Sequence, residues 1–319
     1  MVMEMRVRSI VAQFKLFCVE GWSMYAKRFI QIAVVLPYLC VSVAMSQTTD
    51  TKVDVGGNHL NFHVIKGRGM PILFEAGGGD DSTVWRDILP PLADITHATL
   101  IAYDRPGFGK SGLDPNRHGI VNGVDDLDKG LKALGYDGNV MLVAHSLGGF
   151  YAELYAAKHP DRVKSIVLID ATESCFLTRE QLDINEKTYK DQMAGFKTNR
   201  PGVYYLLSDY RSMADVMQKT AFPSSVPVID IVSDHPPFPS EAERQHWKNC
   251  HQQFASSATN REGILASGTG HYIFHDNPVL VINAIVKAYA DTLNTEQRSS
   301  LLERSLLFNL KEANQTKNP

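Results

Sequence analysis

The chain has 319 residues, of which 44% are hydrophobic and 21% are charged, which is typical of a globular protein with one large or two small domains. Its formal net charge of −3 provides no basic surplus for binding nucleic acid. No internal repeat or long low-complexity segment is visible, so composition alone indicates only a globular protein with enough chain to bury a core.

The N-terminal part has the features of a secretory signal peptide. Lys27 and Arg28 precede an apolar run over residues 29–43, which is followed by the small residues Ala44 and Ser46. This run is shorter than the ~20 residues that span a bilayer. We therefore predict cleavage after Ser46 and a secreted or periplasmic protein with no stable membrane span. The alternative is an uncleaved N-terminal segment that anchors the protein to a membrane.

The predicted mature chain begins after the signal peptide. Met24 lies just upstream of the basic pair, so we expect it to be the real start and residues 1–23 to be an extension. Removal of residues 1–46 leaves Cys175 and Cys250. Exported proteins often pair their cysteines. The sequence leaves open whether these two form a disulfide or remain buried thiols.

Predicted strands and helices alternate over residues 47–319. Alternating and apolar patterns predict a hairpin over residues 53–65 and strands over 71–75, 98–103, 140–143, 165–169, 226–232 and 261–266. Helical spacing predicts helices over 82–92, 124–134, 150–158, 241–254 and 278–293, with an amphipathic piece at 301–311. This alternation predicts the α/β class, with a mostly parallel sheet flanked by helices. Residues 171–225 interrupt it with aromatic-rich helical stretches, which predicts a helical cap.

A turn at residues 144–149 nominates a nucleophile. The predicted buried strand ends at Ala144-His-Ser-Leu-Gly-Gly149, where small residues let the chain turn sharply into a helix while the Ser146 side chain projects. The motif resembles the nucleophile elbow of the α/β-hydrolase family, with Ala144 in place of the usual first glycine. This resemblance implies an α/β-hydrolase fold and a serine nucleophile. It argues against haloalkane dehalogenase and epoxide hydrolase chemistry, which place an aspartate at the elbow.

His271 is the predicted catalytic base. A serine hydroxyl is a weak nucleophile unless a base accepts its proton and a third group orients that base. In the family the order along the chain is serine, acid, histidine. Ser267-Gly-Thr-Gly-His271 follows the last predicted strand and precedes the next predicted helix, which matches the family position of the histidine.

Two aspartates compete for the role of the catalytic acid. In most relatives the acid is the aspartate of a Gly-x-x-Asp turn, and if Ser233 replaces that glycine, the position falls on Pro236, which cannot act. Asp234 lies two residues earlier in the same turn. The other site used in the family is the end of the preceding strand, where Asp170 stands, as in some haloalkane dehalogenases. We favour Asp170 and keep Asp234 as the alternative.

The resemblance also implies two backbone donors for an oxyanion hole. One is the N–H of Leu147, which follows the nucleophile. The other lies in the glycine-rich loop after residue 75, where the spacing back from Trp85 favours Gly78, with Gly79 as the alternative. The histidine usual in this loop is replaced by Ala76.

Two other patterns carry no predicted chemistry. Asp104-Arg-Pro-Gly-Phe-Gly-Lys-Ser111 resembles a structural turn of the family. His271 and His275, and likewise His246 and His251, lack acidic or cysteine ligands at a known metal spacing. We predict no metal and no cofactor.

Taken together, these residues predict an exported serine hydrolase. We expect it to cleave carboxylic esters of small or medium size through an acyl-enzyme, with a small-molecule acyl substrate as its partner. Amides, lactones and carbon–carbon bonds are alternative substrates, because specificity lies in the cap and pocket. A hydrolase fold that has lost catalysis and serves as a binding protein is the alternative from another class.

Overall fold

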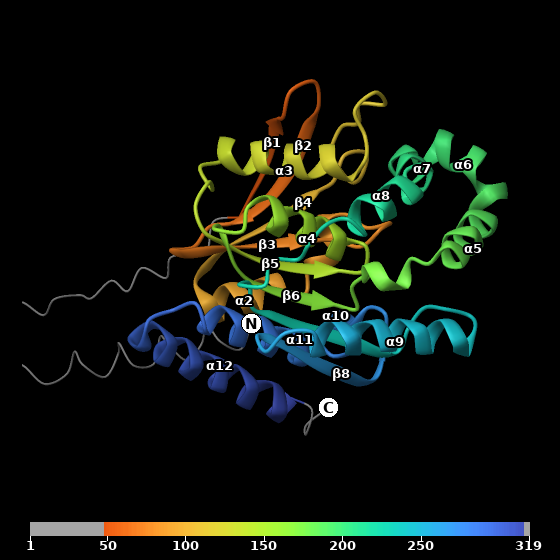
Figure 1. Ribbon diagram of the computed structural model, residues 1–319. Helices are drawn as coiled ribbons and strands as arrows, with labels where there is room; N and C mark the ends of the chain where they lie inside the picture. The colour runs from red at the N-terminus through yellow and green to blue at the C-terminus, as the bar shows by residue number, and fades with distance from the viewer. Residues whose placement is uncertain (1–47, 316–319) are drawn as a thin grey trace, which may run out of the picture. The chain divides into compact units, whose positions relative to one another are not determined.

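An eight-stranded sheet runs through the centre of the structure, a computed structural model that describes residues 48–315 (Figure 1). The strand order is β1-β2-β4-β3-β5-β6-β7-β8. The strands are β1 (Thr48–Asp54), β2 (His59–Ile65), β3 (Gly69–Glu75), β4 (Ala98–Asp104), β5 (Val140–His145), β6 (Val163–Ile169), β7 (Val228–His235) and β8 (Arg261–Gly270). The predicted signal peptide and start site lie outside the described residues.

The strands are parallel except at one edge of the sheet. The hairpin β1–β2 is antiparallel, and β2 also pairs antiparallel with β4. Every later neighbour, from β4–β3 to β7–β8, is parallel. The predicted mostly parallel sheet is therefore confirmed. Because parallel strands end at the same edge, the loops after β3, β5, β6 and β8 meet there.

Alternate side chains of the central strands pack into two hydrophobic layers, one on each face of the sheet. In β5, Leu142 packs into one layer, with the helices over residues 120–133 and 148–158, whereas Met141 and Val143 pack into the other, with the helices over residues 89–96 and 278–290. All three side chains are buried. A strand covered on both faces is a continuous apolar run, which explains why the sequence pattern revealed these strands.

Helices cover both faces of the sheet (Figure 1). Outside the cap they are α2 (Leu89–Thr96), α3 (Ile120–Ala133), α4 (Gly148–Lys158), α9 (Glu241–Ser256), α10 (Ile273–Asp276), α11 (Pro278–Ala290) and α12 (Thr295–Gln315). The single helix predicted over residues 82–92 is wrong, since a 3₁₀ turn, η1 (Ser82–Trp85), precedes a separate α2. Pro90 and Pro91 are the physical reason. Proline lacks the N–H that a helix interior needs and is tolerated in the first turn, where α2 places it.

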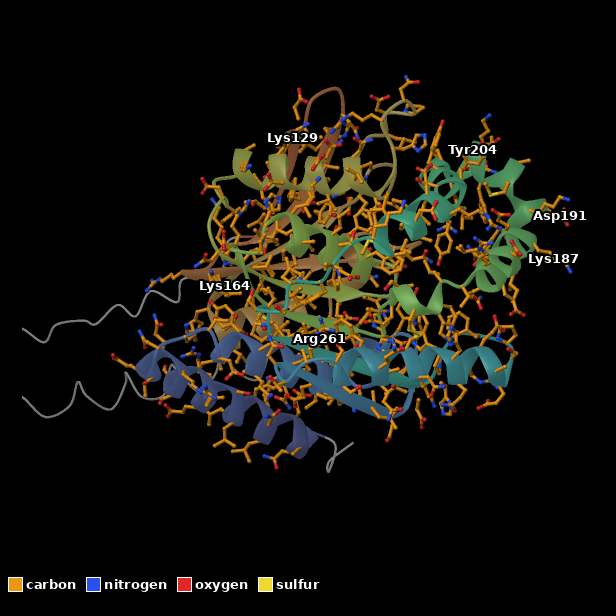
Figure 2. All side chains as sticks on the ribbon, in the orientation of Figure 1. Lys129, Lys164, Lys187, Asp191, Tyr204 and Arg261 are labelled. Carbon is orange, nitrogen blue, oxygen red and sulfur yellow. A yellow bond between two sulfur atoms is a disulfide. The ribbon has the colours of Figure 1, made fainter. Side chains whose placement is uncertain are left out.

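A run of short helices separates β6 from β7. It consists of the 3₁₀ turn η2 (Ser174–Phe176), α5 (Arg179–Tyr189), η3 (Lys190–Gln192), α6 (Met193–Asn199), α7 (Pro201–Ser208) and α8 (Tyr210–Met217). Helices α5–α8, called the cap here, lie beyond the carboxyl ends of the strands (Figure 1). Lys187 and Asp191 lie at the outer edge of the cap (Figure 2).

The cap is tied to the core at two places. Gly202 of α7 packs against Gly107 so closely that a Cβ on Gly202 would lie 2.4 Å from the Gly107 carbonyl oxygen. A disulfide joins Cys175 in η2, at the base of the cap, to Cys250 in α9, which resolves the question that the sequence left open. Within residues 48–315, no helix has both the length and the apolar character needed to cross a membrane.

Candidate active site

Ser146 stands at a strained turn between β5 and α4. Its backbone has φ +53°, the left-handed region that a non-glycine residue seldom adopts. The two glycines that follow are required by space, because a Cβ on Gly148 would lie 2.5 Å from the Ala76 carbonyl oxygen and one on Gly149 would lie 2.7 Å from Ala171 Cβ. The sequence of the turn thus lets the strand and helix approach closely while Ser146 faces outward.

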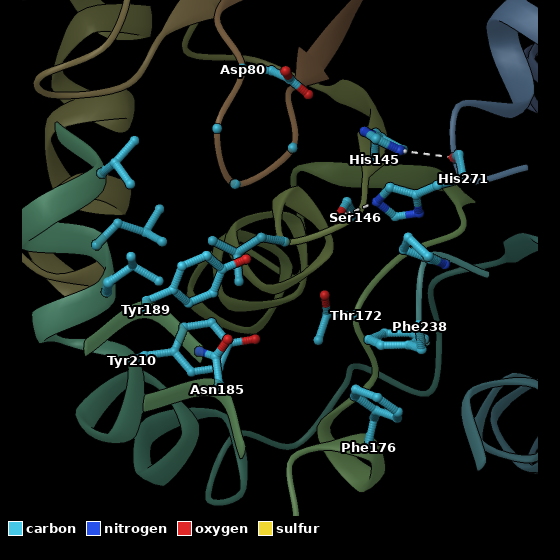
Figure 3. A pocket seen from close by; sticks show the side chains of 18 of the residues that line it. Asp80, His145, Ser146, Thr172, Phe176, Asn185, Tyr189, Tyr210, Phe238 and His271 are labelled. Atoms are coloured by element: carbon cyan, nitrogen blue, oxygen red, sulfur yellow. Dashed lines mark hydrogen bonds between the residues drawn. The ribbon is translucent and has the colours of Figure 1, made fainter. Parts of the chain in front are cut away.

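The structure brings the predicted base to the predicted nucleophile. His271 follows β8, and its Nε2 lies 2.9 Å from Ser146 Oγ (Figure 3). Its Nδ1 lies 2.7 Å from Asp170 Oδ2. With the proton on Nδ1 donated to the carboxylate, Nε2 is free to accept the serine proton, which is the arrangement that nucleophilic catalysis by serine requires.

Asp170 is held as a buried carboxylate. Its side chain is fully buried, and its Oδ1 accepts from the Ser233 N–H and from Trp247 Nε1–H, both at 2.9 Å. Its Oδ2 accepts from Ser233 Oγ–H at 2.9 Å, in addition to His271. Although burial favours the protonated acid, the hydrogen bonds and charge of His271, with those of Ser233 and Trp247, hold the pKa of Asp170 below its ordinary value.

Asp234, the alternative acid, lies elsewhere. Its side chain is 34% exposed and accepts from Lys248 Nζ at 3.1 Å and from the Gly268 N–H at 3.2 Å. These two hydrogen bonds lower the pKa of Asp234, the Gly268 N–H having the larger effect. Because Asp170 and not Asp234 is bonded to His271, the geometry favours the preferred of the two sequence candidates.

The predicted oxyanion donors face the same pocket as Ser146. Gly78 and Leu147 both line it, and a Cβ on Gly78 would lie 3.4 Å from the Leu147 side chain. In the described part of the chain, neither N–H donates to a protein acceptor, so both are available to a substrate oxygen. Gly79, the alternative donor, also lines the pocket, and its carbonyl accepts from Arg200 at 3.3 Å.

Arg105 fixes the backbone of the glycine loop. Its guanidinium is buried and donates to the carbonyl oxygens of Ala76, at 2.5 Å, and Gly77. It also pairs with Glu75 Oε1 at 3.0 Å. Burial raises the pKa of Glu75 to about 6, and the charge of Arg105 opposes that rise. This pair holds two carbonyls immediately before Gly78 and so orients its N–H.

His145 connects the elbow to the loop that carries His271. It is fully buried, and its Nε2–H donates to the His271 carbonyl oxygen at 3.0 Å (Figure 3). Burial, assisted by the neighbouring His271 ring, lowers the pKa of His145 to about 3. The ring is therefore neutral and serves as a fixed hydrogen-bond donor.

A cavity of about 400 Å³ lies between the elbow and the cap. Its walls are mainly aromatic and aliphatic, including Phe176, Tyr189, Tyr210 and Phe238 (Figure 3), together with Phe196, Val203, Leu206, Leu207, Pro237 and Trp247. Polar groups come from Thr172, Gln181 and Asn185, and charged groups near the glycine loop from Asp80 and Arg200. Such a cavity suits a small, largely apolar organic molecule with a few polar groups.

Sequence reasoning missed the residues that support the triad. The sequence pattern presents Ser233 only as a substitute for a glycine, yet Ser233 donates two hydrogen bonds to Asp170. Trp247 stands 77 residues from Asp170, so no local pattern indicated their contact. Arg105 belongs to a turn to which the sequence assigned no chemistry. The motif over residues 104–111 is the sequence feature that could have indicated this role, because an arginine in a buried turn needs hydrogen-bond acceptors.

The fold is that of an α/β-hydrolase, and a serine stands at its elbow. A family model described as the alpha/beta hydrolase fold matches residues 70–201. This match and the likeness to solved structures show that the chain has the alpha/beta hydrolase fold.

Three comparisons illustrate the range of similar proteins. The uncharacterized protein YqjL of Bacillus subtilis is 29% identical over 219 residues, which cover 68% of this chain and 82% of that protein. The 2-(acetamidomethylene)succinate hydrolase of Mesorhizobium japonicum is 32% identical over 148 residues, which cover 46% of this chain and 51% of that enzyme. The solved structure of the epoxide hydrolase CorEH without ligand has a TM-score of 0.61 at 18% identity, covering 77% of this chain and 100% of that one. The last likeness shows the fold alone.

Proposed function

We propose that the protein is a serine hydrolase that cleaves carboxylic esters through an acyl-enzyme. The observation that carries this proposal is the chain of contacts from Ser146 Oγ to His271 Nε2, at 2.9 Å, and from His271 Nδ1 to Asp170 Oδ2, at 2.7 Å. The N–H groups of Gly78 and Leu147 support it as well, since they lie beside the same pocket and have no protein acceptor within residues 48–315.

In this mechanism Ser146 Oγ attacks the ester carbonyl carbon while His271 Nε2 accepts the serine proton. Asp170 stabilises the imidazolium that forms. The Gly78 and Leu147 N–H groups stabilise the negative charge on the carbonyl oxygen. His271 then gives its proton to the departing alkoxide, and a water molecule, activated by the same histidine, hydrolyses the acyl-enzyme.

The pocket supports a substrate of small or medium size. A cavity of about 400 Å³ with aromatic walls accommodates an aromatic or branched acyl group better than a long unbranched chain. We also propose that the protein is exported, since its N-terminus matches a signal peptide and the Cys175–Cys250 disulfide suits an oxidising compartment. N-terminal sequencing of the exported protein tests this, and a start well before Ala44 would contradict it.

A panel of matched p-nitrophenyl esters, anilides and lactones tests the proposed reaction, with kcat/KM as the readout. The proposal expects esters of short or aromatic acids to be the best substrates and Ser146→Ala to abolish their turnover. If correctly folded protein turns over anilides or lactones but no ester, the substrate class is wrong. If it turns over none of them and Ser146→Ala has no effect, a binding role replaces the enzymatic one.

A further inference from the structure

Three buried side chains face one another behind the active site. Glu173 lies three residues after Asp170, Asp230 belongs to β7 and His251 belongs to α9. They are 7%, 1% and 2% exposed, respectively. One possible ligand atom from each lies within 4.8 Å of the other two. None of the three lines the pocket around Ser146.

The hydrogen bonding of this cluster is incomplete. The His251 Nδ1–H donates to both oxygens of Asp230, at 2.9 and 2.8 Å. Glu173 Oε1 and His251 Nε2 are shielded from solvent and have no hydrogen-bond partner among the described residues. Proteins seldom bury a carboxylate oxygen or a ring nitrogen without a partner. A proton or a metal ion between these atoms would satisfy both of them.

The surrounding side chains do not supply that partner. Arg261 lies near the cluster, but its guanidinium packs over the rings of Phe222 and Phe254 and donates to Ser257 Oγ. It forms no salt bridge with the carboxylates within residues 48–315. Burial raises the pKa of the neighbouring Glu153 to about 7, so this side chain carries only part of a negative charge at neutral pH.

We propose that Glu173, Asp230 and His251 bind one divalent transition-metal ion, for which Zn²⁺ is the best match. Two carboxylate oxygens and one imidazole nitrogen are ligands that Zn²⁺ accepts, with bonds of about 2.0–2.2 Å. Two ligands of a tetrahedral ion lie roughly 3.4 Å apart by this bond length. The observed spread of 4.8 Å or less therefore requires the three side chains to move inward when the ion binds.

The position of the cluster makes this a structural site. It joins the loop after β6 to β7 and α9, and residues of the same three segments surround Asp170. Trp247, which donates to Asp170, contacts the His251 ring with centroids 5.2 Å apart. The Cys175–Cys250 disulfide lies alongside, since Cys175 is two residues after Glu173 and Cys250 precedes His251. An ion at this position would join the segments that surround Asp170 without contacting the substrate.

The sequence prediction of no metal rested on ligands close together in the chain. It could not find a site whose ligands come from three separate elements. The metal-free alternative is that protons fill the same role. Burial, together with the charge of Asp230, raises the pKa of Glu173. Although burial favours a neutral His251 ring, the charge and hydrogen bond of Asp230 raise the pKa of His251.

Metal analysis of the purified full-length protein tests the proposal. We expect about one equivalent of zinc per chain by plasma mass spectrometry. After removal with a chelator, we expect Zn²⁺ to raise the melting temperature, and Co²⁺ to give d–d absorption bands of a site with nitrogen and oxygen ligands. Glu173→Gln keeps the side-chain shape and should lower the occupancy at least tenfold. The matched control Glu262→Gln, at an exposed carboxylate paired with Lys287, should leave it unchanged.

Either of two results would overturn the proposal. One is a folded wild-type protein that is isolated without metal and binds neither Zn²⁺ nor Co²⁺, while the Glu173→Gln variant has an equal or higher melting temperature. That outcome is expected if Glu173 is protonated, because glutamine resembles a neutral glutamic acid. The other is bound metal that both variants retain equally. If Glu173→Gln does not fold, the metal content and the Co²⁺ spectrum of the wild type decide.

Discussion

Replacing Asp170 by asparagine should abolish most of the activity while preserving the fold. Asp170 has φ +44°, a conformation that asparagine tolerates better than alanine does. The amide oxygen can take the place of Oδ1, which accepts from the Ser233 N–H and Trp247. The amide NH₂ then replaces Oδ2 and faces His271 Nδ1. An amide donor at that point forces the ring proton to Nε2, where it blocks transfer from Ser146.

The expected loss is about 10⁴-fold in kcat, the typical cost of the wrong histidine tautomer in a serine triad. It corresponds to about 5.5 kcal/mol of lost transition-state stabilisation. The matched control is Asp234→Asn, which removes a charge from a partly exposed carboxylate bonded to Lys248 and the Gly268 N–H. That variant should retain activity within about twofold of the wild type.

The assay is the burst of p-nitrophenol from a good ester substrate, with circular dichroism as the check of folding. Single-turnover kinetics separate acylation from product release. A folded Asp170→Asn variant with acylation within tenfold of the wild type would refute the reasoning. So would an Asp234→Asn variant that loses acylation while Asp170→Asn keeps it.

Three further predictions concern stability and the cap. The pKa of buried His145 is about 3, whereas that of an unfolded histidine is about 6.5, so protons bind preferentially to the unfolded state between these values. The free energy of unfolding should therefore be highest above pH 6.5 and fall by about 3 kcal/mol by pH 4. Urea titrations should show this pH dependence, and His145→Gln should reduce it. Reduction of the Cys175–Cys250 disulfide, which spans 75 residues, should cost about 4 kcal/mol by loop entropy, and unchanged urea midpoints would contradict its structural role. Gly202→Ala places a Cβ 2.4 Å from the Gly107 carbonyl oxygen and should destabilise the protein by about 1–3 kcal/mol and raise KM. The control is Gly195→Ala, whose added Cβ has no neighbouring atom within 4 Å and should change neither quantity.

The sheet and two members of the triad could be predicted because their signals are local. Buried parallel strands are continuous apolar runs, and the small residues around Ser146 are demanded by contacts of 2.5–2.7 Å at the neighbouring glycines. His271 was found from its place after the last strand. The helix predicted over residues 82–92 is broken because Pro90 and Pro91 fit only the first turn of a helix, so that α2 begins at Leu89.

The acid could not be decided from sequence because the decision lies in the register of two strands. The Asp170 N–H donates to the Ile231 carbonyl oxygen at 2.6 Å, and this alignment brings Ser233 to the Asp170 carboxylate. One residue of slip would change which side chains meet. The contacts of Trp247 and of the Glu173–Asp230–His251 cluster likewise join separate elements, so only the folded chain reveals them.

The central claim is that Ser146 is an activated nucleophile, and labelling with a fluorophosphonate probe tests it most directly. The proposal predicts that the folded wild-type protein takes up one probe molecule, that peptide mapping places it on Ser146, and that Ser146→Ala takes up none. Folded wild-type protein that remains unlabelled, or label that persists in Ser146→Ala, would contradict the claim.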